Sequence, residues 1–166
     1  MAANTFANPL PATQTGVFSL QTIVRVVIDT NLLLSSLSTR SSSHWLYQGI
    51  FDGTFELCVT TEILDEYAEI ITWGYRQRGL EVADAVLEAI LNSPYVRLVT
   101  VYYGWPLIYN DPDDNKLVDC AIAASAVCIV TEDGHFDVLK TIGFPSVQAL
   151  NLAQFRFLLD ESQNRL

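Results

Sequence analysis

Apolar residues follow two alternating patterns along this chain. Short runs rich in β-branched residues are typical of buried strands. They occupy residues 23–28, 55–59, 96–101 and 128–131, with a fifth, edge-like run at 147–150. Between them, apolar residues recur every three or four positions, as on one face of a helix. Helices are expected at 32–37, 44–51, from 60 to about 78, at 81–91, 115–127 and 135–141, and finally at 152–159. Strands that alternate with helices predict an α/β fold with a mainly parallel sheet covered on both faces.

The ends of the chain and its apolar segments bound the domain organisation. Residues 1–21 are aperiodic and contain Asn, Thr, Gln and Pro, so we interpret them as a flexible N-terminal extension before one domain spanning 22–166. This N-terminal stretch has no Lys or Arg and no compact apolar core, unlike a signal peptide. No apolar run approaches the roughly 20 residues that cross a bilayer. The sequence therefore favours a cytoplasmic protein without a membrane segment.

The composition indicates a globular protein, and its net charge makes binding of nucleic acid harder to explain. Half of the residues are hydrophobic, and 17% are charged. Three cysteines, Cys58, Cys120 and Cys128, lie in apolar surroundings and are interpreted as small core residues without a zinc or disulfide role. The formal net charge is -10, whereas proteins that bind nucleic acid through phosphates usually have a basic surface. Metal ions and a few local cations could hold such a ligand, a partner could supply positive charge, or nucleic acid is not the ligand.

Acidic residues follow two of the predicted strands. Asp29 comes directly after the first strand, and Asp133 comes after the fourth. Because the carboxyl ends of parallel strands share one edge of the sheet, these carboxylates converge if the two strands are neighbours. Asp119 lies in the first turns of the helix that precedes the fourth strand, with Asp114 before it as a cap or a ligand. Glu66 lies beside the buried face of the long helix that starts near residue 60.

Such a group of acids predicts a divalent-metal site. Carboxylates within about 5 Å of one another cannot all stay ionised without a compensating charge. Hard oxygen ligands favour Mg²⁺ or Mn²⁺ over zinc. One or two such ions can activate water and stabilise the charge that develops on a phosphodiester. No Ser–His or Cys–His pair is visible that would indicate covalent chemistry instead.

Four segments in this order resemble the PIN-domain family of nucleases, and in particular its branch of toxin components from prokaryotic toxin–antitoxin pairs. They are VVIDTNLLLSSL (26–37), TTEILDEYAEII (60–71), NDPDDNKLVDCAIAASA (110–126) and IVTEDGHF (129–136). The resemblance implies a Rossmann-like three-layer α/β/α fold, divalent-metal-dependent cleavage of RNA, an antitoxin partner and a homodimer. It implies catalytic, metal-binding acids at Asp29, Glu66, Asp119 and Asp133, with Asp114 as a fifth metal ligand.

Residues around these acids are candidates for substrate binding. The resemblance places Asn31 beside the first acid and Thr131 as the small hydroxyl residue before the last, and Lys116 lies one turn from Asp119. Lys116 is a phosphate contact or a solvent-exposed helix lysine. The aromatic residues of the loop 102–112 stack on unpaired bases or pack in the core or an interface.

Two other functions remain as alternatives. A phosphatase of the haloacid type also places an aspartate after its first strand, but it needs a second aspartate two residues later, where this chain has Asn31. A binding or regulatory module with the same fold would act by associating with a basic partner, with weak or no cleavage, and the negative charge favours that partner.

Overall fold

A five-stranded sheet forms the centre of the molecule. The structure is a computed structural model that describes residues 23–76 and 82–164. The strands are β1 (Arg25–Ile28), β2 (Glu56–Val59), β3 (Val96–Leu98), β4 (Cys128–Val130) and β5 (Ala149–Leu150). Their order across the sheet is β3-β2-β1-β4-β5, and every neighbouring pair is parallel. The expected parallel α/β sheet is therefore confirmed.

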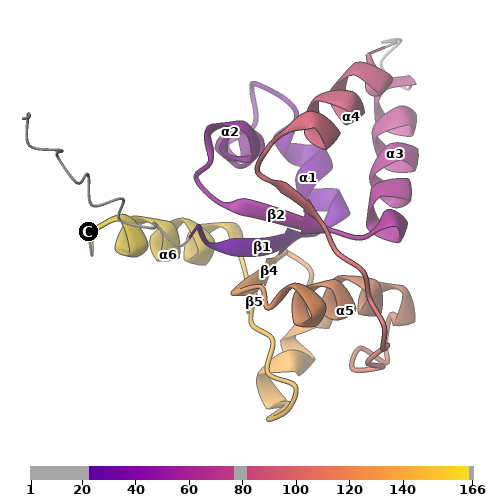
Figure 1. Cartoon of the computed structure of the whole chain (residues 1–166), viewed down its shortest axis with the longest axis vertical. Coiled ribbons are helices and arrows are strands. Elements are labelled where there is room, and N and C mark those ends of the chain that lie inside the picture. The colour runs from indigo at the N-terminus through magenta and orange to yellow at the C-terminus, as the bar shows by residue number, and fades with distance from the viewer. Residues whose placement is uncertain (1–22, 77–81, 165–166) are drawn as a thin grey trace, which may run out of the picture.

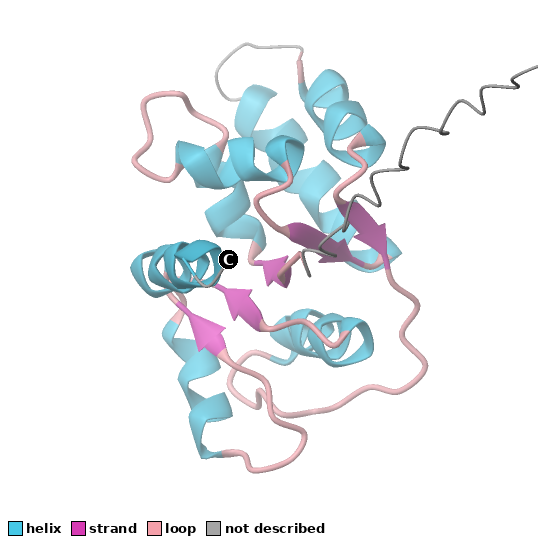
Figure 2. Ribbon diagram, turned by 60° about the vertical axis from the view of Figure 1, so that its left-hand side comes forward, coloured by secondary structure: helices cyan, strands magenta, loops and turns pink. Residues whose placement is uncertain are grey.

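Helices cover both faces of this sheet. The α-helices are α1 (Thr30–Ser36), α2 (His44–Asp52), α3 (Thr61–Arg76), α4 (Ala83–Asn92), α5 (Asn115–Ala124) and α6 (Leu152–Asn164). Two 3-10 helices are η1 (Pro112–Asp114) and η2 (Gly134–Thr141). Helices α1 to α4 lie on one side of the sheet and α5 lies on the other, while α6 lies against its β5 edge (Figures 1 and 2). This arrangement is the three-layer α/β/α fold that the sequence predicts.

The central position of β1 explains why its residues are apolar. Val26, Val27 and Ile28 are fully buried, since β2 and β4 flank the strand and helices cover both of its faces. Val26 pairs with Cys128 and Ile28 with Val130. This register aligns the last residues of β1 and β4, so the residues that follow them, Asp29 and Thr131, emerge together at the same edge.

Helix α3 is fixed against the end of β1 by a buried tyrosine. Its apolar face places Ile63, Tyr67 and Ile71 in the core. The Tyr67 hydroxyl donates a hydrogen bond to the carbonyl oxygen of Ile28. The first half of α3, which carries Glu66, is therefore held beside the strand end that carries Asp29.

Three predicted elements end earlier or differ in type. Strand β3 stops at Leu98 rather than at residue 101, because β2 ends at Val59, whose carbonyl accepts the Val99 amide as the last bond between the two segments. Helix α5 stops before Ser125, which has a left-handed backbone with φ of 51°. The segment expected to be an α-helix at 135–141 is the 3-10 helix η2.

Other expectations concern the ends of the chain and its cysteines. The predicted extension 1–21 and the predicted last residues of the helix ending near 78 lie outside the described residues. Cys58, Cys120 and Cys128 are free thiols that are fully buried, as expected of core residues. Among the described residues, no helix combines the length and the apolar character needed to span a membrane.

Candidate metal centre

The carboxylate of Asp29 is held in a fixed position at the end of β1. Only 8% of the residue is exposed. Its Oδ1 accepts a hydrogen bond from the Asn31 amide at 3.0 Å, so Asp29 also caps α1. Its Oδ2 accepts one from the Thr131 hydroxyl at 2.6 Å. Burial raises the pKa of Asp29, and the negative charges of Asp133 and Glu66 raise it further, against the two hydrogen bonds.

Thr131 links Asp29 to the acid that follows β4. While its hydroxyl donates to Asp29, the same oxygen accepts the backbone amide of Asp133 at 3.0 Å. Oδ1 of Asp133 accepts the His135 amide at 2.8 Å and so caps η2. Both strand-end aspartates are therefore positioned by caps and by one shared, buried threonine, rather than left free to turn away from each other.

Asp114 approaches the same place from the start of α5. Burial is the main reason that its pKa is raised to about 6, and the charges of Asp111, Asp133 and Asp29 follow in that order. Its Oδ2 is buried and has no hydrogen-bond donor. A buried carboxylate oxygen without a donor is costly unless a cation compensates it. This oxygen is the observation that best fits a metal ligand.

A histidine faces three of these carboxylates. The Nδ1 atom of His135 lies 3.5 Å from Asp133 Oδ1, 3.7 Å from Asp114 Oδ2 and 3.9 Å from Asp111 Oδ2. Asp111, Asp114 and His135 offer ligand atoms that all lie within 4.8 Å of one another. The residues present therefore fit a divalent cation, mostly through hard oxygen donors. Sequence reasoning missed Asp111, although it belongs to the same DPDD stretch as Asp114.

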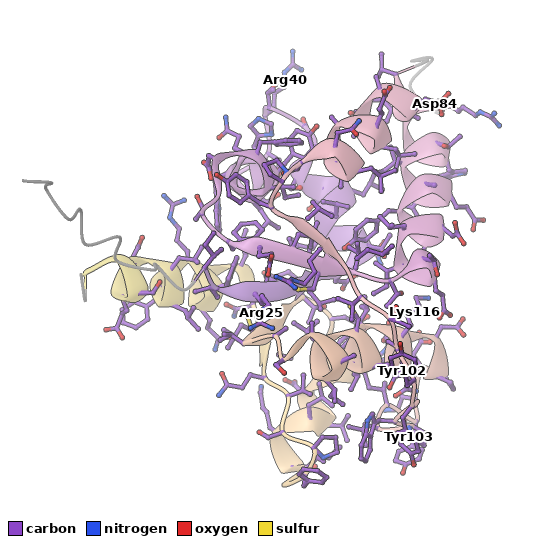
Figure 3. All side chains as sticks on the ribbon, viewed as in Figure 1. Arg25, Arg40, Asp84, Tyr102, Tyr103 and Lys116 are labelled. Atoms are coloured by element: carbon purple, nitrogen blue, oxygen red, sulfur yellow. The ribbon has the colours of Figure 1, made fainter. Side chains whose placement is uncertain are left out.

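Glu66 forms an ion pair with Lys116 beside the acidic site. Its Oε2 lies 2.7 Å from Nζ of Lys116, an ion pair that joins α3 to the second residue of α5. The charge of Glu66 still contributes to the raised pKa of Asp29. Lys116 lies where α5 begins, close to the N-terminal end of α3 (Figure 3). Within the described residues, it is the lysine that neutralises part of this acidic region.

Asp119 has a different environment from the other predicted ligands. Its Oδ1 accepts the Trp105 amide at 2.6 Å. Burial raises its pKa, the Trp105 amide opposes the shift, and Glu62 is the acid that adds to it. Asp119, Glu62 and Lys116 line a groove of about 280 Å³ beside the end of β3. Asp119 therefore faces this groove, whereas the charges of Asp29, Asp114 and Asp133 act on one another.

The predicted substrate-binding residues differ in how free they are. The hydroxyl of Thr131 is committed to Asp29 and Asp133, and the residue is only 4% exposed. Asn31 is exposed, and its backbone amide binds Asp29. The ammonium of Lys116 is paired with Glu66, and its side chain is 18% exposed.

Comparison with known proteins identifies the family of the chain and agrees with its fold. The PIN-domain family model matches residues 25–135, two thirds of the chain. The chain belongs to the PIN-domain family. This family consists of nucleases, and the matched region runs from β1 through the caps of η2, so it includes every acid described above.

One solved structure supports the same fold, and a second has a slightly lower TM-score. VapBC2 from Rickettsia felis, bound to a DNA fragment from their promoter, is similar with a TM-score of 0.51 and 13% identity, covering 77% of this PIN-domain chain and 98% of that one. PAE2754 from Pyrobaculum aerophilum has a TM-score of 0.49 and 16% identity, covering 93% and 99%. No curated protein sequence matches this chain significantly.

Proposed function

We propose that this PIN-domain protein is a divalent-metal-dependent endoribonuclease, acting as the toxin component of a toxin–antitoxin pair. The observation that carries the proposal is the convergence of Asp29, Asp114 and Asp133 from three separate segments on one place at the carboxyl edge of the sheet. The charge of Asp133 raises the pKa of both Asp29 and Asp114, so the three carboxylates form a site of unfavourable charge that a cation relieves. Membership of a nuclease family supports phosphodiester hydrolysis as the use of that cation.

The metal ligands in this proposal differ from those expected from the sequence, because Glu66 and Asp119 are not among them. In this proposal Asp29, Asp114 and Asp133 hold Mg²⁺ or Mn²⁺. Asp111 and His135, whose ligand atoms lie within 4.8 Å of each other and of Asp114, are further ligands. When bound, the ion supplies positive charge that polarises the phosphodiester and lowers the pKa of water. Asp114, rather than Asp119, is the acid contributed by the α5 region, because only the former has an unpaired buried oxygen facing the other acids.

The chain's own residues have supporting roles in the proposed reaction. Thr131 orients Asp29 by donating a hydrogen bond to its Oδ2. The other oxygen, Oδ1, is held by the Asn31 amide at the start of α1. Glu66 positions the ammonium of Lys116 at the boundary between the acid cluster and the groove at β3. There, the lysine provides a positive charge for a phosphate of the substrate.

An antitoxin partner is the second part of the proposal. The structural neighbour VapBC2 is bound to a DNA fragment from their promoter, and the net charge of -10 suits a basic partner segment. Association without cleavage is the competing function, and the same charge favours it. Metal binding separates the two, because a module that acts only by association does not need a metal ion.

The deciding experiment compares the purified wild-type protein with Asp29→Asn on single-stranded RNA in Mg²⁺, in Mn²⁺ and in EDTA. We expect wild-type cleavage in either metal, none in EDTA, and a loss of at least 100-fold in Asp29→Asn, because the central ligand loses its charge. Equal cleavage by both proteins contradicts the nuclease assignment.

A matched pair of variants tests which acid serves as ligand. Asp114→Asn should weaken Mn²⁺ binding in calorimetry by tenfold or more, whereas Asp119→Asn should change it by less than threefold. The reverse order would return Asp119 to the ligand set. Absence of metal binding in the wild type would favour the association-only function.

A further inference from the structure

Exposed aromatic side chains gather on two loops next to the proposed active site. Tyr102 is 93% exposed, Tyr109 is 78% exposed and Phe144 is 81% exposed. Tyr103, 66% exposed, lies edge-on to Trp105 with ring centroids 4.8 Å apart, and Trp105 lies edge-on to Phe144 at 6.0 Å. These five residues are called the aromatic platform. Trp105 is half-buried, whereas the other four rings are exposed, have no role in the core and indicate a binding surface.

The loop that carries most of the platform is held in place by α5. The side-chain oxygen of Asn115 accepts the amides of Leu107 and Ile108 at 2.9 and 2.8 Å, and Asp119 accepts that of Trp105. The Asn115 amide group also donates to the carbonyl of Ile108. The rings are therefore presented on an ordered backbone, which lowers the entropic cost of binding a ligand.

The platform continues into the proposed active site at both ends. The groove at β3 is lined by residues 98–101, directly before Tyr102, and by Lys116, which is paired with Glu66. Tyr109 lies two residues before Asp111, at the margin of the acid cluster. Figure 3 shows Tyr102, Tyr103 and Lys116 on the side of the molecule where α5 begins. A ligand on the rings therefore lies beside the place where cleavage is proposed.

Charge restricts how a polynucleotide can be held here. The chain has 19 acidic residues against nine Lys and Arg. In the described part of the chain, the groove at β3 has Lys116 as its one cation, between Glu62 and Asp119. Binding through many phosphate contacts is therefore not available. Stacking of bases on aromatic rings needs no positive charge and tolerates any sequence.

We propose that the aromatic platform binds unpaired nucleobases of the substrate strand, so that this protein holds single-stranded RNA mainly by stacking and not by phosphate contacts. The inference rests on the proposed nuclease function for the identity of the ligand. It adds a substrate-binding surface made of Tyr102, Tyr103, Tyr109, Trp105 and Phe144, and it selects single strands, because paired bases in a duplex do not expose their faces to protein rings.

Binding is tested without cleavage, by fluorescence anisotropy of a labelled 12-nucleotide single-stranded RNA in EDTA. The double variant Tyr102→Ser/Tyr103→Ser should bind about 10- to 100-fold more weakly, at roughly tenfold for each stacked base lost. Tyr102→Phe/Tyr103→Phe keeps the rings and should bind within about twofold of wild type. Phe157→Ser, which removes an equally exposed ring (65%) from α6, is the matched control and should also stay within about twofold.

Two further readouts distinguish stacking from other modes. The logarithm of the wild-type binding constant should fall with the logarithm of salt concentration with a slope near -1, as for one or two phosphate contacts. A duplex of the same sequence should bind at least tenfold more weakly than the single strand.

Three outcomes overturn the proposal. One is unchanged RNA binding in the Ser/Ser variant, and another is a salt slope steeper than about -4. The third is a change in oligomeric state by light scattering with RNA binding unchanged, which would assign the rings to a protein interface. Since these measurements contain no metal, they are independent of the Asp29→Asn cleavage assay, which can fail while the platform still binds RNA.

Discussion

At the scale of the residue, Thr131 and Asp114 decide the chemistry of the site. Thr131 is a small side chain that satisfies two strand-end groups at once, by donating to Asp29 and accepting from Asp133. Asp114 is the carboxylate whose pKa is raised to about 6. The first residue makes the site rigid, and the second makes it unfavourable without a cation.

Replacing Thr131 tests whether its hydroxyl group makes the site rigid. In Thr131→Val the volume is kept, but Asp29 and the Asp133 amide lose their partner. We expect the free energy of unfolding to fall by about 1–3 kcal/mol and metal affinity to fall severalfold. Thr131→Ser keeps the hydroxyl and should retain most of both. Urea denaturation and calorimetry measure these effects, and equal losses in Val and Ser would assign them to packing of the methyl group instead.

The raised pKa of Asp114 predicts a pH dependence with a definite sign. The folded protein binds this proton up to about pH 6, whereas the unfolded chain releases it near 3.8, the ordinary value. The bound proton of Asp114 therefore stabilises the fold fully below the unfolded-state pKa of 3.8. This stabilisation is lost as the pH rises through the folded-state pKa of about 6. In EDTA, Asp114→Asn should be more stable than wild type at pH 7, on the order of 1 kcal/mol after solvent screening.

The stability of Asp114→Asn has to be compared with that of wild type over the pH range between these two pKa values. The advantage of Asp114→Asn should disappear near pH 4, where wild-type Asp114 is protonated and resembles asparagine. A difference that does not vary with pH would contradict the raised pKa. Metal affinity of the wild type should rise through the same interval, because protons and metal ions compete for this carboxylate.

At the scale of the element, the loop between β3 and α5 depends on one side chain. Asn115 accepts two loop amides and donates to the carbonyls of Ile108 and Pro112. It ties the platform to the start of the helix that also carries Lys116. Asp119 also holds the Trp105 amide of this loop, and Ile108 is buried in the core.

Removing this clamp should loosen the loop without unfolding the sheet. In Asn115→Ala the two amides lose their acceptor, at about 1–3 kcal/mol each if they stay buried, so the loop opens locally instead. Hydrogen exchange of Leu107 and Ile108 should accelerate by tenfold or more. The amides of Val27 and Ile129 in the central strands are the internal control and should keep their rates. Acceleration throughout the sheet would show that Asn115 supports the whole fold.

At the scale of the whole molecule, binding of the proposed metal ion is expected to stabilise the folded chain. A ligand that binds only the folded state stabilises it by about 2.7 kcal/mol at 100 times its dissociation constant. For a chain of this size, that corresponds to roughly 5–10 °C in the midpoint of thermal unfolding. Charge repulsion relieved by the ion is the physical source of this gain.

Calorimetric scans test this coupling. Mn²⁺ should raise the midpoint of the wild type, and EDTA should reverse the rise. The variants Asp29→Asn and Asp114→Asn should show little response. NaCl at matched ionic strength is the control for general screening, since the chain carries a net charge of -10. An equal rise in NaCl would mean that screening, rather than a bound ion, is responsible.

The sequence by itself determined the order of the elements, the type of most of them and the general place of the acids. Runs such as 23–28 and 128–131 are short, rich in β-branched residues and followed by Asp29 and Asp133, and burial on both faces forces that composition on any central parallel strand. The amphipathic period likewise located α3 and its buried face. These are local signals, because each depends on residues within a few positions of one another.

Only the tertiary structure decided which acids face one another. Asp114 and Asp119 are both near the start of α5, and no periodic pattern in the sequence separates them. The register of β1 on β4 and the path of the loop through Trp105 direct Asp114 toward Asp29 and Asp133, while the Trp105 amide holds Asp119 in the groove at β3. The exposure of Tyr102, the 3-10 form of η2 and the early end of β3 were decided in the same way. Each depends on contacts between segments far apart in the chain, and local propensity carries no information about them.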